Sequence, residues 1–67
     1  MTNEEKIKIF DLLNTKKTCR QSFNMCRDEK MVNMYDDQIS GIYSVLMLFD
    51  LFEEYFNYTY ERNKENV

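Results

Sequence analysis

The chain has 67 residues and a mass of 8.2 kDa, with nine basic residues, twelve acidic residues and no histidine. The absence of histidine excludes Ser-His and Cys-His nucleophile pairs and histidine metal ligands. One glycine excludes a glycine-rich phosphate loop, and two cysteines alone cannot complete a zinc site. A composition of 43% hydrophobic and 31% charged residues is typical of a folded domain. We therefore expect one small domain over residues 1–67, with no metal and no cofactor.

The pattern of residues predicts an all-α fold, because no proline interrupts it and no long stretch alternates with a period of two. Thr2 and Glu5 have the spacing of a capping box, which predicts a first helix over residues 3–13. Asn14 and Thr15 are expected to end this helix, since asparagine tolerates the left-handed conformation found at helix ends.

A second capping box, Thr18 with Gln21, predicts a second helix over residues 19–34. The four consecutive charged residues at 27–30 fit either this helix or a turn, and the sequence leaves both open.

The cysteines and the apolar segments indicate a reducing location away from membranes. Cys19 and Cys26 are seven residues apart, which on one helix separates their Cα atoms by about 10 Å, too far for a disulfide. We expect two free thiols. The N-terminus is acidic rather than basic, and the longest apolar stretch, residues 42–52, is shorter than the roughly 20 residues that span a bilayer. The sequence thus predicts a cytoplasmic protein without membrane contact.

A third and longest helix is predicted over residues 37–62, beginning at Asp36 and Asp37, with the tail 63–67 frayed. Apolar and aromatic side chains cover most of its circumference, more than two short helices can bury. We expect a three-helix hairpin or bundle that forms a homodimer or higher oligomer through this helix. The expected interface with a second copy or a partner comprises Phe49, Phe52, Tyr55, Phe56, Tyr58 and Tyr60.

Basic residues on the second predicted helix raise the alternative of a DNA-binding regulator. Residues 15–30 carry a net charge of +3. The candidate nucleic-acid contacts are Lys16, Lys17, Arg20, Asn24 and Arg27. Arginine can recognise guanine, asparagine can recognise adenine and lysine can contact phosphate. The chain as a whole has a net charge of −3, so a nucleic-acid partner is disfavoured.

Carboxylates on the third predicted helix raise the question of catalysis. Asp50, Glu53, Glu54 and Asn57 share one strip, but magnesium chemistry requires carboxylates from a facing helix, which the sequence does not offer. We therefore expect a protein that is not an enzyme.

The aromatic and acidic C-terminal half favours binding to a basic partner protein, because tyrosine is enriched at interfaces. The amino-acid usage, rich in Asn, Lys, Ile, Phe and Tyr, indicates an AT-rich genome such as that of a bacteriophage. The main hypothesis is a small non-catalytic protein that modulates or inhibits another macromolecule, in the manner of a phage inhibitor of a host protein. It would act in the cytoplasm of its own organism or of an infected host. A further alternative is an oligomer that captures a nucleotide in an aromatic and basic pocket between subunits.

Overall fold

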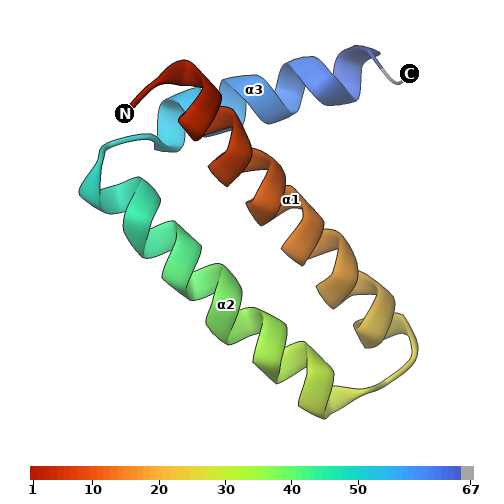
Figure 1. Cartoon of the computed structure of the whole chain (residues 1–67). Coiled ribbons are helices and arrows are strands. Elements are labelled where there is room, and N and C mark those ends of the chain that lie inside the picture. Colours follow the sequence, from red (N-terminus) through yellow and green to blue (C-terminus); the bar gives the residue numbers. More distant parts are fainter. Residues whose placement is uncertain (66–67) are drawn as a thin grey trace.

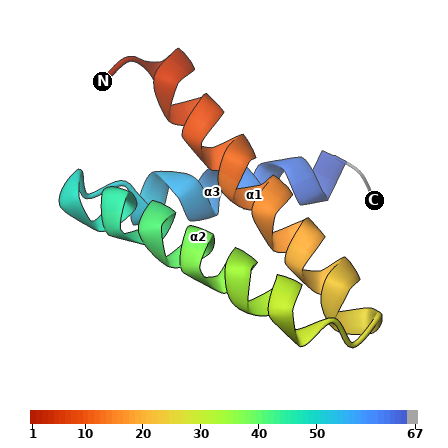
Figure 2. The same ribbon diagram turned by 60° about the horizontal axis from the view of Figure 1, so that its bottom comes forward.

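Three α-helices make up residues 1–65, the part of the chain that the computed structural model describes. They are α1 (Asn3–Met25), α2 (Glu29–Leu48) and α3 (Phe52–Glu65). α1 and α2 form an antiparallel hairpin, and α3 crosses behind α1 near the end of the hairpin that holds the N-terminus (Figure 1). A view turned by 60° shows the same crossing (Figure 2). The predicted all-α fold of three helices is confirmed.

The first helix is more than twice as long as the sequence predicted. α1 continues through Asn14 and Thr15 to Met25, so the expected end at residue 13 and the expected second start at residue 19 are wrong. The side chain of Thr18 donates to the carbonyl oxygen of Asn14 at 3.0 Å and does not cap a new helix. The side-chain amide of Asn14 forms hydrogen bonds with side chains of α3. Asn14 therefore makes a tertiary contact and does not end the helix.

The long third helix of the prediction, residues 37–62, is divided between α2 and α3. Asp36 and Asp37 lie within α2 and do not begin a helix. Of the two interpretations of residues 27–30, the turn is correct in part, because the chain turns at Cys26–Asp28 and Glu29 already belongs to α2. Residues 63–65, expected to fray, continue α3, and residues 66–67 lie outside the described part of the chain.

Both turns have the hydrogen bonding of a Schellman motif, in which a residue in the left-handed conformation closes the helix. Arg27 has φ of 60°, and the next N–H, of Asp28, donates to the carbonyl of Phe23 at 3.0 Å. Asp50 has φ of 53°, and the N–H of Leu51 donates to the carbonyl of Leu46 at 2.8 Å. Neither turn contains glycine, which explains why the sequence did not reveal them.

The helix starts are capped by side chains. The predicted capping box is confirmed: the N–H of Glu5 donates to the hydroxyl of Thr2, and the N–H of Thr2 donates to the Glu5 carboxylate, each at 3.2 Å. The hydrogen bonds that the Glu5 carboxylate accepts from the backbone N–H and the hydroxyl of Thr2 lower the pKa of Glu5. At α2 the carboxylate of Asp28 accepts from the N–H of Met31 at 3.2 Å. Asp28 therefore both ends the first turn and starts the second helix.

The core lies where α3 crosses the hairpin. Its six buried side chains come from all three helices and the second turn: Phe10, Leu13, Ile39, Leu46, Leu51 and Tyr55. The ring of Phe10 lies 5.6 Å from the ring of Tyr55 and 5.6 Å from that of Tyr58, measured between centroids. The far half of the hairpin contributes none of these buried side chains. No helix of the described chain has the length and apolar character that crossing a membrane requires.

Replacing the left-handed residues by glycine should stabilise the fold. We expect Arg27→Gly and Asp50→Gly each to raise the free energy of unfolding by up to about 1 kcal/mol, because glycine adopts positive φ without steric cost. Urea denaturation at one fixed protein concentration measures the change. Lys30→Gly, in the first turn of α2, is the control and should lower stability by about 1 kcal/mol. A loss of stability in either turn variant would contradict this account of the turns.

Candidate protein-binding surface

The basic residues of α1 mostly contact aromatic and acidic side chains of the same chain. The ammonium group of Lys16 lies 5.6 Å from the ring centroid of Tyr35, and the Nε atom of Arg20 pairs with the carboxylate of Asp36. Lys17 lies 5.1 Å from the ring centroid of Tyr43. Such contacts are cation–π interactions and an ion pair between the helices of the hairpin.

The ammonium group of Lys17 faces aromatic rings of the same chain. Its ammonium group lies 5.0 Å from the ring centroid of Tyr55 as well as near Tyr43. Burial disfavours the charged form, but the interactions with the two tyrosines outweigh burial and raise the pKa of Lys17. Lys17 is therefore protonated at neutral pH, and its charge faces the chain's own rings.

The candidate nucleic-acid contacts do not form one free surface. Lys16, Lys17 and Arg20 are half-buried, while Asn24 and Arg27 are exposed at the far end of the hairpin. Arg27 belongs to the left-handed turn and not to a helix face. The structure thus brings together three of the five residues, but in a seam between α1 and α2. A base-reading helix requires these side chains to point away from its own domain.

A polar network joins α1 to α3 beside the core. The Tyr55 hydroxyl donates to the Asn14 side-chain oxygen at 2.7 Å, and the Asn14 amide donates to the Thr59 hydroxyl at 3.3 Å. The Tyr58 hydroxyl donates to the Asp11 carboxylate at 2.6 Å. Each of these groups is partly buried, so the network satisfies polar atoms that α3 would otherwise desolvate.

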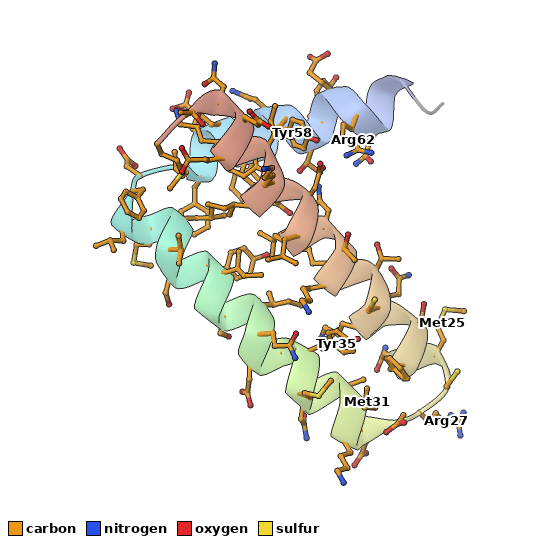
Figure 3. All side chains as sticks on the ribbon, in the orientation of Figure 1. Met25, Arg27, Met31, Tyr35, Tyr58 and Arg62 are labelled. Carbon is orange, nitrogen blue, oxygen red and sulfur yellow. The ribbon has the colours of Figure 1, made fainter. Side chains whose placement is uncertain are left out.

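Arg62 closes the network at the edge of the molecule. Its guanidinium group donates to the Tyr58 hydroxyl at 3.1 Å and pairs with the carboxylate of Asp11 (Figure 3). These interactions raise the pKa of Arg62, the hydrogen bond with Tyr58 most of all. Together they fix the inner side of α3 against α1.

A shallow cleft of about 650 Å³ lies in the angle between α1 and α3. Its charged lining residues are Asp11, Lys17 and Arg62, and each already has a partner within the chain. The cleft lies within one copy and not between subunits, so it differs from the nucleotide pocket that the sequence suggested. Its charges stabilise the helix crossing.

The six predicted interface residues fall into two groups. Tyr55 is only 1% exposed and belongs to the core, and Tyr58 is half-buried against α1. Phe49 is exposed at the end of α2, whereas Phe56 and Tyr60 are 58% and 66% exposed on α3. Phe52 lies between the two groups, half-buried against the core. The expectation that all six share one interface is therefore wrong: the inner residues hold α3 in place, and the outer ones face solvent.

The outer residues of α3 form a continuous aromatic line. The ring of Phe52 stacks on Tyr43 of α2 at 5.8 Å and on Phe56 at 6.1 Å between centroids. Tyr60 follows four residues after Phe56, so it lies on the same side of the helix. We call Phe52, Phe56 and Tyr60 the α3 aromatic strip.

Negative charge borders the α3 aromatic strip. Glu53 and Glu61 are exposed next to Phe52 and Tyr60 in the sequence. In the described chain neither carboxylate forms an ion pair, whereas Glu54 pairs with Lys6 of α1 at 3.0 Å. The strip therefore combines aromatic rings, of which Phe56 and Tyr60 are exposed, with carboxylates that form no ion pair among the described side chains.

Among residues 1–63, whose side chains the structure describes, there is no group of three or more His, Cys, Asp or Glu that could bind a metal ion. Cys19 and Cys26 are free thiols, as their spacing predicts. The sequence analysis missed Asp11, Asn14 and Thr59, which hold α3 in place. Asp11 and Asn14 are three residues apart, directly after the core residues Phe10 and Leu13, and this spacing was the available signal.

Comparisons with family models, with curated proteins and with solved structures found no match to the chain. The function is therefore argued from the surfaces described above.

Neighbouring aromatic residues of α3 should differ sharply in their effect on stability. We expect Tyr55→Ala to lower the free energy of unfolding by about 3–5 kcal/mol, enough to unfold most of so small a protein. Phe56→Ala should cost about 1 kcal/mol or less, because the side chain is mostly exposed. Circular dichroism in a urea titration tests both. Equal losses in the two variants would contradict the placement of Tyr55 inside and Phe56 outside.

Proposed function

We propose that the protein is a non-catalytic interaction protein that binds another protein through the α3 aromatic strip. The observation that carries this proposal is the exposure of Phe56 and Tyr60, 58% and 66%, on a helix whose opposite side contacts α1 through Tyr55 and Tyr58. Aromatic side chains contribute much of the binding energy of protein interfaces, and tyrosine is enriched among the strongest contributors.

Charge favours a basic protein as the partner. Glu53 and Glu61 border the strip without an ion pair among the side chains of residues 1–63, which the structure describes, and the chain has a net charge of −3. Carboxylates at the edge of an interface mainly accelerate association and select against partners of like charge. A protein that covers a basic surface of its partner blocks that surface for other ligands. Modulation or inhibition is therefore the effect that we propose.

The basic residues of α1 support a protein partner over a nucleic acid. Lys16 and Lys17 lie over tyrosine rings, and Arg20 is paired with Asp36. Phosphate binding would have to break these contacts first. No observation favours the nucleotide-capturing alternative, because the charges of the cleft are paired within the chain.

A pull-down with the full chain tests the proposed function. Tagged wild-type protein should retain a basic partner from an extract of its source cells. Phe56→Ala and Tyr60→Ala should each weaken binding of the purified partner at least tenfold, measured by titration calorimetry. Glu53→Lys should slow association, because it reverses a charge at the edge of the strip.

Asp37→Lys is the matched control, because it makes the same charge change on the exposed side of α2. Its association rate should stay close to that of the wild type. Retention of nucleic acid that is lost in Arg27→Ala, with no effect of Phe56→Ala, would overturn the proposal.

A further inference from the structure

The protein has more surface than a compact monomer of its mass. Its accessible surface is 5313 Å², whereas a compact 8.2 kDa monomer exposes about 4,500 Å². Its radius of gyration is 12.9 Å, against about 11 Å expected for this length. The molecule measures 36 × 31 × 16 Å, so it is a flat slab. The hairpin is one helix thick, and α3 covers only one side of it (Figure 1).

The side of α1 that faces away from α3 carries the apolar residues Leu12 and Phe23, and the exposed, charged Glu5 and Lys8 lie at its N-terminal end. α3 contacts α1 through Phe10 and Asn14. At about 100° per residue, Leu12 and Phe23 lie roughly 160–200° around the helix from Asn14. Leu12 is 48% exposed, and Phe23 is half-buried against Tyr35.

The corresponding side of α2 is also apolar. α3 contacts α2 through Tyr43, which stacks on Phe52. Val45 and Phe49 lie about 160° and 120° around α2 from Tyr43, and they are 37% and 53% exposed. Together the two helices present what we call the open face, made of Leu12, Cys19, Phe23, Met31, Val45 and Phe49.

The open face repeats every seven residues on both helices. On α1, Leu12 and Cys19 are seven residues apart, and so are Lys16 and Phe23. On α2 the same spacing gives two series: Met31, Gln38 and Val45, and Tyr35, Ile42 and Phe49. A seven-residue repeat keeps a helix stripe facing a partner helix that crosses at about 20°. The surface therefore suits a second pair of helices with the same repeat.

We infer that a second copy of this chain covers the open face, so that two hairpins form a four-helix bundle with each α3 on the outside. The surface of the chain exceeds that of a compact monomer by about 800 Å². Each partner in a protein–protein interface of standard size buries about the same area. Among the repeat positions named above only Lys16 is charged, and its ammonium group lies over Tyr35. At the N-terminal end of the same side of α1, Glu5 and Lys8 carry opposite charges. Two copies can therefore meet face to face without strong repulsion.

This interface differs from the one expected from the sequence, which placed the oligomer on the C-terminal helix. It also goes beyond the proposed function, because it leaves the α3 aromatic strip free for a different protein. The two proposals can therefore fail separately.

Sedimentation velocity over a dilution series tests the second copy. The wild type should sediment as a dimer at high micromolar concentration and dissociate on dilution. Leu12→Glu and Val45→Glu should each raise the dimer dissociation constant at least 30-fold, because each buries a carboxylate in an apolar interface. The matched control Phe56→Glu, on the α3 aromatic strip, should leave the constant within threefold of the wild type.

A wild-type chain that stays a monomer at all concentrations, or a dimer lost only in Phe56→Glu, would overturn the inference.

Discussion

The structure depends on the tight turn between α2 and α3. The N–H of Leu51 donates to the carbonyl of Leu46 at 2.8 Å, and both side chains are buried. This bond reverses the chain direction within three residues, so α3 returns across the hairpin at Phe10 and Leu13 instead of continuing away from it. The first turn of α3 follows directly, because the N–H of Tyr55 donates to the carbonyl of Leu51 at 2.9 Å. Without this turn, Tyr55 would have no core to enter.

The sequence contained enough information for the helical class and for the capped start of α1, but not for the helix ends. Thr2 and Glu5 act within four residues of each other, so their pattern is local and can be recognised. The ends at Arg27 and Asp50 depend on the left-handed conformation of residues that adopt it rarely, and tertiary packing selects it. Asparagine is a residue type common at helix ends, yet the side chain of Asn14 accepts a hydrogen bond from a hydroxyl of α3, 41 residues away.

The sequence predicted only part of the candidate binding surface, because the position of the second turn determines which aromatic residues share a side. A continuous helix from residue 37 to residue 62 would place Phe49 and Phe56 on one side. The turn interrupts that periodicity, so Phe49 remains with the hairpin and Phe56 belongs to α3. Sequence reasoning identified the correct kind of residue, exposed aromatics near the C-terminus, but it could not separate Tyr55 from its neighbour Phe56. That separation depends on the direction in which α3 crosses α1.

The polarity of the seam between α1 and α2 explains why the two proposed surfaces lie on different sides. In the half of the hairpin beyond α3, Lys16 and Arg20 form the seam with Tyr35 and Asp36, and no side chain there is fully buried. This half contributes little apolar burial to the monomer, and the second copy that we propose on the open face would add burial there. In that bundle each copy would carry its own α3 on the outside. One assembly then presents the α3 aromatic strip twice, and a partner with two basic sites would bind more tightly to it than to a single chain.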